Sequence, residues 1–333
     1  MVLTRFTKGL LAAAAIAAAG FVVATDGASA RDLRMGLITP PSHVWTKVAN
    51  RMAEKLPEAT GGALTLQVFP AGQLGVEQEM YQQMGAGLLD AGLMTGAITS
   101  LRAPSVSGWF TPYLFKDVSA AIAASKLPAA QDMLKELDRA GLVGLGYTFA
   151  GMRHVLMRSG AVTGPDSLKG KKIRIVPFPA MKVFWQAIGA VPTPVNLTEV
   201  YQALQSGLLD GIDIDLDALV GLKFQEVGKS LTLTSHMAFP SVMVVSKKTW
   251  MSLSDEEKAA FKSVIDEALA WGSAQQVEAE KKNLESLQGK IEITTLENGT
   301  EAFAGAIAAV QKSFAGNAII EAFQKEVREG AAQ

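Results

Sequence analysis

A sixteen-residue pattern occurs twice in this chain, and the second copy begins 120 residues after the first. The first copy, EMYQQMGAGLLDAGLM, begins at Glu79, and the second, EVYQALQSGLLDGIDI, begins at Glu199. Each copy predicts a helix that ends at a glycine, because glycine tolerates the left-handed conformation found at many helix ends. An apolar, strand-like segment follows each helix, and a strand-like run ending at proline precedes each copy, at 64–70 and 172–177.

A strand, a helix and a second strand form a βαβ unit, so two such units predict two related α/β lobes. Chance similarity is the alternative explanation, because helix–glycine–strand junctions share a composition. The length of 333 residues also exceeds what one hydrophobic core comfortably holds. Two lobes that face each other are an arrangement well suited to a ligand cleft.

The first thirty residues have the pattern of a secretory signal peptide. Arg5 and Lys8 precede the apolar run LLAAAAIAAAGFVVA, and Ala-Ser-Ala at 28–30 offers the small residues that a signal peptidase requires. The alternative is an N-terminal membrane anchor, but the run is alanine-rich and shorter than the roughly 20 residues of a typical membrane span. We therefore expect cleavage near Ala30, a mature protein that begins near Arg31, and a periplasmic location.

Charge and cysteine content exclude several classes of protein. The formal net charge is −1, which argues against a nucleic-acid-binding protein, since these usually carry a strong basic excess. The chain contains no cysteine, so disulfide bonds, a thiol nucleophile and a thiolate metal site are all excluded. A hydrophobic fraction of 49% is ample for a core that must hold the protein without disulfides.

The remaining pattern predicts several further elements. An amphipathic helix is expected over 46–62 and a buried strand over 242–250. Ser254 and Glu257 have the spacing of a capping box, and about thirty residues without proline follow them. Such a helix is roughly 45–50 Å long, which is enough to run across both lobes. Two more helices are expected in the C-terminal tail.

Catalytic and metal-binding patterns are weak. The chain has three histidines, and none has the spacing of a metal ligand with another histidine or a carboxylate. The run DIDLD places Asp213, Asp215 and Asp217 on one side of a strand if the chain stays extended. Ala218 stands where a calcium loop requires glycine, so we expect no metal site. Asp213 is the best placed to touch a ligand, and a solvated strand edge is as good an interpretation for the other two.

Two arginines lie in apolar surroundings. Arg153 is in the stretch YTFAGMRHVLM, and Arg174 interrupts the alternating apolar run KKIRIVP. A guanidinium group keeps its charge in proteins, and its planar fork suits a carboxylate held by two parallel hydrogen bonds. The alternative for Arg174 is a salt bridge within the protein. The residues alone therefore predict an exported two-lobed α/β protein with a cationic cleft and no catalytic set.

Several ordered segments together resemble the DctP-type solute-binding proteins of tripartite ATP-independent periplasmic (TRAP) transporters. They are AEKLPEATGGALTLQVFPAGQLG, GMRHVL, SLKGKKIRIVPFP and VPTPVNLTEVYQALQSGLLDGID. The resemblance covers about residues 34–290. It implies a periplasmic-binding-protein fold in which crossing strands join two α/β lobes and a long helix lies against both. We expect residues 31–151 with 240–280 to form lobe I and residues 152–239 with 281–330 to form lobe II.

The resemblance also implies a ligand site. In this family the arginine of the KGxKIR segment forms the principal salt bridge to the ligand carboxylate, and that residue is Arg174 here. The arginine of the GxR segment is a frequent second contact and corresponds to Arg153, and a residue just after the second DG commonly reaches the ligand, which suggests Asp213. The remaining residues of the expected ligand-binding set are Phe178, Trp185 and His43.

Departures from the family pattern affect the expected ligand. Ile214 stands where members that bind acidic sugars often carry a polar residue, and Pro177, followed by Phe178, stands where some members have an amide. These changes predict a more apolar pocket and a ligand with fewer hydroxyl groups, or with an apolar or aromatic portion.

The expected function is therefore that of a non-enzymatic extracytoplasmic solute-binding subunit without a cofactor. It would capture a small organic acid and deliver it to TRAP membrane permease subunits. The alternatives are an exported sensor for an organic acid and, with less support, an exported metal-assisted hydrolase that uses the DIDLD run. The sequence leaves open the identity of the acid, a co-bound cation and the choice between monomer and dimer.

Overall fold

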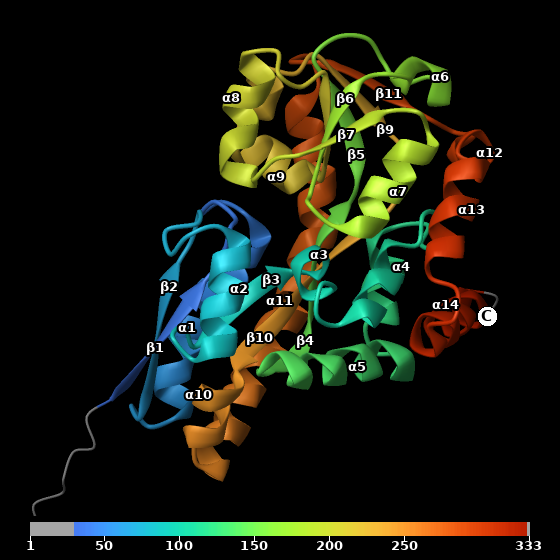
Figure 1. Cartoon of the computed structure of the whole chain (residues 1–333). Coiled ribbons are helices and arrows are strands. Elements are labelled where there is room, and N and C mark those ends of the chain that lie inside the picture. The colour runs from blue at the N-terminus through green and yellow to red at the C-terminus, as the bar shows by residue number, and fades with distance from the viewer. Residues whose placement is uncertain (1–29, 332–333) are drawn as a thin grey trace, which may run out of the picture.

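The computed structural model describes residues 30–331 and contains two β-sheets with helices packed around them (Figure 1). The first sheet has the strand order β2-β1-β3-β10-β4, and the second has the order β11-β9-β5-β8-β6-β7. The predicted signal peptide lies outside the described residues, apart from Ala30. The strands are β1 (Arg31–Gly36), β2 (Leu64–Phe69), β3 (Ala91–Thr95), β4 (Leu142–Met152), β5 (His154–Met157), β6 (Lys172–Ile175), β7 (Val191–Pro194), β8 (Gly211–Ile214), β9 (Ser230–Leu233), β10 (Ala238–Ser246) and β11 (Glu292–Thr295).

The helices surround the two sheets. The α-helices are α1 (Val44–Ala59), α2 (Glu77–Ala86), α3 (Gly96–Thr99), α4 (Val118–Ala124), α5 (Pro128–Lys135), α6 (Pro165–Leu168), α7 (Pro179–Ala187), α8 (Val200–Gln205), α9 (Leu216–Gly221), α10 (Lys247–Ser252), α11 (Asp255–Leu287), α12 (Gly299–Ala302), α13 (Ala304–Ser313) and α14 (Ala318–Ala331). Four short 3₁₀ helices complete the described elements, at η1 (Pro104–Phe110), η2 (Glu136–Ala140), η3 (Leu197–Glu199) and η4 (Phe224–Glu226). We use "first lobe" and "second lobe" below for the parts built on the first and second sheets.

The repeated sequence pattern forms equivalent structures in the two lobes. In the first lobe α2 connects to β3, which is parallel to β1, and in the second lobe α8 connects to β8, which is parallel to β6. Both predicted helix-ending glycines have a left-handed backbone, with φ of 75° at Gly87 and 80° at Gly207. These conformations confirm the helix ends predicted from the two sequence copies.

The edge of the second sheet contains a strand that the sequence pattern did not predict. β7 carries two of its four residues as proline, Pro192 and Pro194, and pairs only with β6 among the described strands. Proline has no backbone N–H to donate, so it is confined to edge strands of a sheet. The prolines of β7 therefore explain why it lies at the edge of the sheet, with no further strand beside it among the described strands.

The chain crosses between the lobes along the β4–β5 and β9–β10 connections, along α11, and again between α13 and α14 (Figure 1). β4 of the first sheet continues into β5 of the second sheet with only Arg153 between them, and β9 leads back to β10. The two strand crossings are bonded together, because Arg153 N donates to Met237 O over 2.7 Å. The third connection is α11, a helix of 33 residues that packs against α1 and β4 and also against α9.

The predicted long helix is confirmed, together with its start. Ser254 accepts a hydrogen bond from Glu257 N, and the Glu257 side chain accepts one from Ser254 N, which is the predicted capping box. Gly272 lies where α11 approaches α1, and a Cβ atom built there would be 2.2 Å from Val48 Cγ2. The two helices can therefore pack this closely only at a residue without a side chain.

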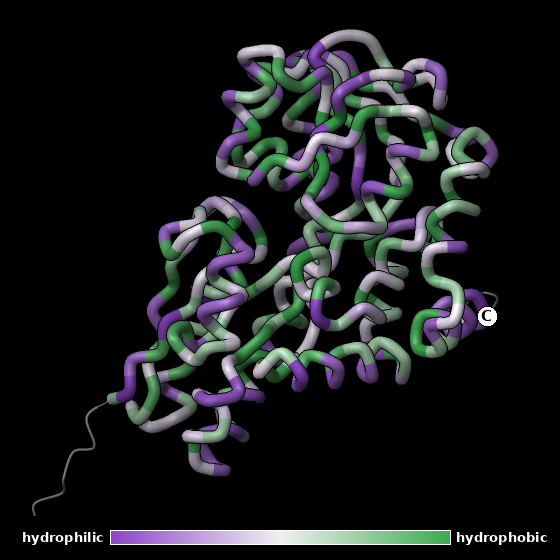
Figure 2. Tube along the Cα trace, viewed as in Figure 1, coloured by the Kyte–Doolittle hydropathy of each residue, from purple (hydrophilic) through white to green (hydrophobic). Residues whose placement is uncertain are grey.

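The hydrophobic core follows the sheets. Every residue of β10 is buried, and the hydropathy colouring shows apolar segments along the central strands and hydrophilic residues mainly on outer helices and loops (Figure 2). A larger apolar cluster fills the first lobe and reaches α7 and β6, and a smaller one lies around α8, β8 and α9. Near the C-terminus, α13 packs against α7 of the second lobe, and α14 packs against α5 of the first lobe. No helix within residues 30–331 is both long and apolar enough to cross a membrane.

Candidate functional site

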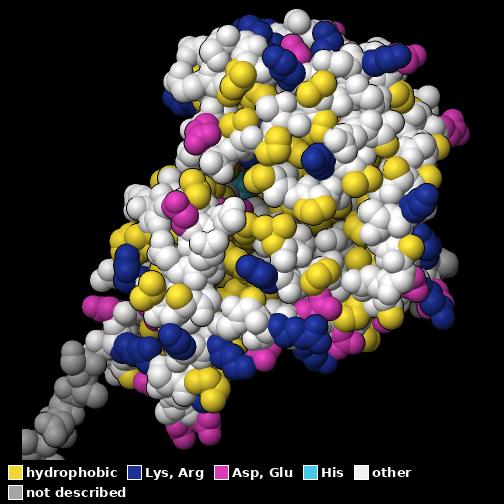
Figure 3. All heavy atoms as spheres, viewed as in Figure 1, with side chains coloured by type: hydrophobic (Ala, Val, Ile, Leu, Met, Phe, Trp, Pro, Cys, Tyr) yellow, Lys and Arg dark blue, Asp and Glu magenta, His cyan; other side chains and the backbone are white. Residues whose placement is uncertain are grey.

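A cavity of about 200 Å³ lies between the two lobes. In the space-filling view the surface is hollowed at the junction of the lobes, and acidic and basic side chains are interspersed over the rest of this face (Figure 3). Both lobes contribute to the cavity wall. The lining residues are Ile38, Thr39, His43, Trp45, Val76, Glu77, Gln78, Thr95, Ile98, Ala150, Arg153, Arg174, Val176, Pro177, Asn196, Leu197, Ile214, Asp215, Ala218 and Phe239.

Arg174 projects from β6 into this cavity wall, and its side chain is almost fully buried, at 3% exposure. Its Nε donates to Val195 O over 2.9 Å, and no other hydrogen bond or ion pair of its guanidinium is formed with residues 30–331. Burial, and next the positive charge of Arg153, lower the pKa of Arg174 to about 9, so it stays cationic at neutral pH. Both terminal nitrogens are therefore left for an anion in the cavity.

Arg153 lies at the point where β4 passes into β5, and it is 1% exposed. Its Nε donates to Asp213 Oδ1 over 2.5 Å, its Nη1 donates to Asp215 Oδ2 over 2.9 Å, and its Nη2 donates to the Asp213 carbonyl. The guanidinium carbon lies 4.2 Å from the centre of the Phe239 ring. Arg153 therefore lines the cavity with its charge already balanced by two carboxylates.

Asp213 is fully buried behind the cavity wall and is not among the residues that line it. Besides Arg153, its carboxylate accepts from Trp185 Nε1 over 3.0 Å and lies 2.9 Å from His236 Nε2. Burial acts to raise the pKa of Asp213, but the charges and hydrogen bonds of Arg153 and His236 hold it well below its ordinary value. In this arrangement Asp213 positions Arg153 and does not face the cavity.

The other two acidic residues of DIDLD are arranged differently from the extended strand considered in the sequence. β8 ends at Ile214, and Asp215 then caps α9 by accepting from Ala218 N over 2.8 Å. Asp217 lies in the first turn of that helix. Both side chains are buried, so the interpretation as a solvated strand edge is wrong. Aspartate is among the residues preferred at a helix N-cap, and Asp215 therefore suits the start of a helix directly after the strand.

Three other residues of the predicted ligand set occupy different places. His43, at the N-terminal end of α1, lines the cavity. Phe178 precedes α7 and packs on Phe110 with ring centres 4.4 Å apart, and Trp185 lies in α7, bonded to Asp213. Neither Phe178 nor Trp185 is among the lining residues. Of the six predicted residues, the structure therefore brings Arg174, Arg153 and His43 to the cavity.

Glu77 is a cavity residue that the sequence reasoning missed. It starts α2, and its carboxylate accepts from Thr95 N over 2.6 Å and from Thr95 Oγ1 over 2.8 Å. Burial raises the pKa of Glu77 to about 7, although these hydrogen bonds and the charge of Arg174 act to lower it. The available signal was its place in the first turn of a repeated helix, two residues after the QLG segment.

The described residues offer no cluster of metal ligands. No group of three or more histidine, aspartate or glutamate side chains within residues 30–331 could hold a metal ion. Burial, and next the charges of His236 and Arg153, lower the pKa of His154 to about 3, so this histidine is neutral at physiological pH. The arrangement can hold an anion in an enclosed, mostly apolar space.

Comparison with known proteins agrees with this architecture. Residues 35–317 match the bacterial extracellular solute-binding protein family 7, DctP. The chain is 29% identical over 309 residues to the 2,3-diketo-L-gulonate-binding periplasmic protein YiaO of Escherichia coli, which covers 92% of this chain and 91% of the relative.

Two solved structures have the same fold at similar identity. A TRAP periplasmic solute-binding protein from Bradyrhizobium, in complex with galacturonate, has a TM-score of 0.85 and 28% identity, covering 90% of this chain and 100% of that one. One from Bordetella, with density assigned as pantoate, has a TM-score of 0.82 and 28% identity, covering 88% and 98%. This chain belongs to the bacterial extracellular solute-binding protein family 7, the DctP-type solute-binding proteins of TRAP transporters.

Proposed function

We propose that this protein captures a small organic acid in the periplasm, after removal of a signal peptide near Ala30, and delivers it to the membrane permease subunits of a TRAP transporter. The two lobes would correspond to residues 31–151 with 240–280 and residues 152–239 with 281–330. The acid carboxylate is held by Arg174 as the principal contact. Arg153, which faces the same cavity, adds to the positive potential that attracts it.

One observation carries this proposal. Arg174 is buried in the cavity wall as a cation, and no carboxylate of residues 30–331 forms an ion pair with it. A buried charge without a directly paired partner is unfavourable, so such a site is best explained by a counter-ion that arrives with the ligand. Its two terminal nitrogens match the two oxygens of a carboxylate.

The cavity lining supports a particular class of acid. Its wall is mostly apolar. Pro177 and Ile214, the two residues that depart from the family pattern, both belong to it. The apolar part of the wall cannot satisfy hydroxyl groups, and an unsatisfied buried hydroxyl costs roughly 1–3 kcal/mol. The ligand is therefore a carboxylic acid with few hydroxyls and an apolar portion. A hydroxyl near Glu77 is the exception, since that carboxylate can accept its proton in a hydrogen bond.

The relatives supply two probes that differ in this respect. Pantoate and galacturonate are bound by related solute-binding proteins, and pantoate has fewer hydroxyls and an apolar branched portion. Isothermal titration calorimetry of the mature chain should show tighter binding of pantoate than of galacturonate. Binding of galacturonate alone would contradict the proposed ligand class while leaving the carboxylate-binding function intact. Binding of no carboxylic acid from a broad panel would contradict the function itself.

A further inference from the structure

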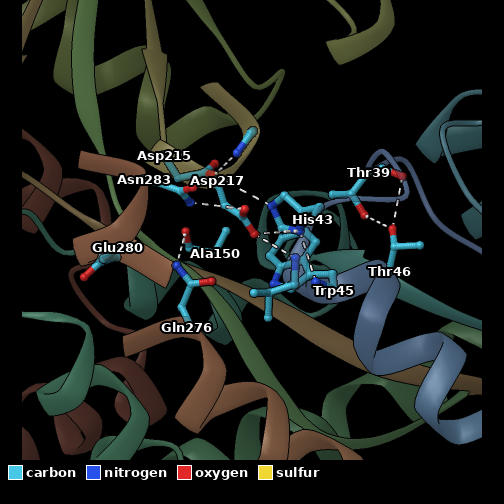
Figure 4. Close-up of polar contacts among 12 residues, drawn as sticks. Thr39, His43, Trp45, Thr46, Ala150, Asp215, Asp217, Gln276, Glu280 and Asn283 are labelled. Carbon is cyan, nitrogen blue, oxygen red and sulfur yellow. Dashed lines mark hydrogen bonds and ion pairs between the residues drawn. The ribbon is translucent and has the colours of Figure 1, made fainter. Parts of the chain in front are cut away.

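The N-terminal end of α1, in the first lobe, is held by a side chain of the second lobe. Val44 N, the first helical N–H of α1, donates to Asp217 Oδ2 over 2.7 Å. Asp217 is 6% exposed, and its other carboxylate oxygen accepts from Asn283 Nδ2 of α11 over 3.3 Å (Figure 4). A carboxylate at this position is favourable, because the first N–H groups of a helix have no partner within the helix and carry partial positive charge.

His43 lies inside the same junction and is 1% exposed (Figure 4). Its Nδ1 accepts from Trp45 N over 3.1 Å, which places the ring proton on Nε2 in the neutral form. Nε2 lies 3.7 Å from Asp215 Oδ1, and Nδ1 lies 3.7 Å from Asp217 Oδ2. The histidine ring therefore fills the space between two carboxylates of the second lobe.

The loop before α1 also packs closely on the end of α9. A Cβ atom built on Gly221, the last residue of α9, would lie 2.8 Å from Ser42 Oγ, in the loop that leads into α1. The two lobes therefore meet here through a helix end, a buried side chain and a glycine. The junction is formed by protein atoms, and Asp217 is not among the residues that line the cavity.

Separation of the lobes would break this junction. Asp217 follows β8 of the second sheet, whereas Val44 follows β1 of the first sheet. The hydrogen bonds of Arg153 also join the two sheets, but Arg153 is itself part of the β4–β5 connection, whereas Asp217 and Val44 are not part of any connection between the lobes in the described chain. A rotation of the lobes that carries α9 away from α1 would leave both the Asp217 carboxylate and the Val44 N–H to water.

We propose that Asp217 is an interlobe latch, which holds the lobes closed by capping α1 across the cleft, independently of any ligand contact. A latch of this kind raises the closed fraction of the ligand-free protein. It thereby raises the apparent affinity for any ligand that binds the closed state, in proportion to that fraction. This inference goes beyond the proposed function, and it can be tested without knowing the acid.

The absence of native cysteine makes the test direct. Gln82→Cys on α2 and Gln202→Cys on α8 place one spin label on an exposed position of each lobe. Double electron–electron resonance on the ligand-free, full-length mature chain then gives the distribution of interlobe distances. The protein that carries only these two substitutions should show a population whose label-to-label distance matches that between residues 82 and 202 in the present structure.

Three further variants separate the latch from general stability. Asp217→Ala removes the acceptor, and Val44→Pro removes the donor at a helix position where proline is tolerated. Asp117→Ala is the matched control, because Asp117 caps α4 within the first lobe by accepting from Ala120 N over 2.8 Å. Both latch variants should reduce the ratio of closed to open protein about fivefold, the typical effect of losing one helix cap, and the control should not.

Two results would overturn the latch. One is a distance distribution for Asp217→Ala and Val44→Pro that matches that of Asp117→Ala. The other is the absence of a closed population in the ligand-free double-cysteine background. Neither result bears on carboxylate binding, so failure of the latch is distinguishable from failure of the proposed function.

Discussion

At the residue scale, two buried arginines have different roles that their sequence contexts did not separate. Both interrupt apolar strands, and both were expected to face a carboxylate ligand. The structure pairs Arg153 with Asp213 and Asp215, whereas Arg174 has only the Val195 carbonyl as a partner within the described chain. The difference depends on residues some sixty positions away, which only folding brings to Arg153.

Replacement of Arg174 tests its role as the carboxylate anchor. Arg174→Ala and Arg174→Lys should each weaken binding of the acid by about 2–5 kcal/mol, because lysine cannot form the two parallel hydrogen bonds. Isothermal titration calorimetry measures the loss. The thermal midpoint of the ligand-free protein should not fall, because the substitution removes a buried cation that has no direct ion pair within the described chain and whose burial is unfavourable. Affinity within a factor of two of the original for both variants would contradict the anchor role.

Asp213 should matter for stability in a pH-dependent way. Asp213→Asn leaves Arg153 with less compensation, so the free energy of unfolding at pH 7 should fall by about 3–5 kcal/mol. The pKa of Asp213 is depressed in the folded state, so its contribution is present above the ordinary value of 3.8 and is lost as pH falls further. Urea titrations should therefore show the native and variant proteins converging below about pH 4. Asp266→Asn, at an exposed pair with Lys262, should show no comparable difference.

At the element scale, α11 runs along both lobes, and its side chains also bond the backbone of β4 next to the strand crossing. Gln276 Nε2 donates to Ala150 O over 2.9 Å (Figure 4). Glu280 Oε1 accepts from Met152 N over 2.6 Å. Between them, Gly151 has φ of 103°, and a Cβ there would be 2.3 Å from Glu280 Oε1. The sequence predicted the helix and its start from local signals. It could not predict which side chains of one helical turn would reach the backbone of β4.

The raised pKa of Glu280 predicts a second pH dependence of the free energy of unfolding, with a sign opposite to that for Asp213. Burial raises its pKa from 4.5 to about 7, against the lowering effect of the Met152 hydrogen bond. Its contribution to stability is therefore fully present below pH 4.5 and is lost as pH rises through about 7. Glu280→Gln should become more stable than the native protein as pH rises, by up to about 3 kcal/mol at pH 8. Urea titrations at pH 5 and pH 8 measure this, and Glu278→Gln, on an exposed position of α11, is the control.

At the scale of the whole molecule, two strand connections, α11 and the C-terminal helices couple the lobes, so closure and stability should respond together to a ligand. A ligand that binds only the folded, closed protein adds about 2.7 kcal/mol to the free energy of unfolding at one hundred times its dissociation constant. Both lobes should then unfold in one transition that shifts as a unit. Two separate calorimetric transitions, of which only one shifts with ligand, would show that the lobes are not coupled in this way.

The sequence by itself determined the features that depend on local chemistry. A repeated helix-ending glycine, a capping box and alternating apolar runs each act over a few residues, so the two α/β lobes, the long helix and the buried position of Arg174 could be predicted from them. The ordered motifs also predicted the family that the comparisons then showed. The edge strand β7 was not predicted, because its two prolines are typical of a loop and not of a strand.

The tertiary structure alone decided how the charged residues are paired. Asp213 faces Arg153 instead of the cavity, Asp215 and Asp217 form caps instead of a strand face, and Phe178 and Trp185 pack outside the lining. Each outcome depends on a partner far along the chain, because burial of a charge is favourable only where a specific opposite charge or donor meets it. Local sequence shows that a charge will be buried, and only the assembled fold shows what neutralises it.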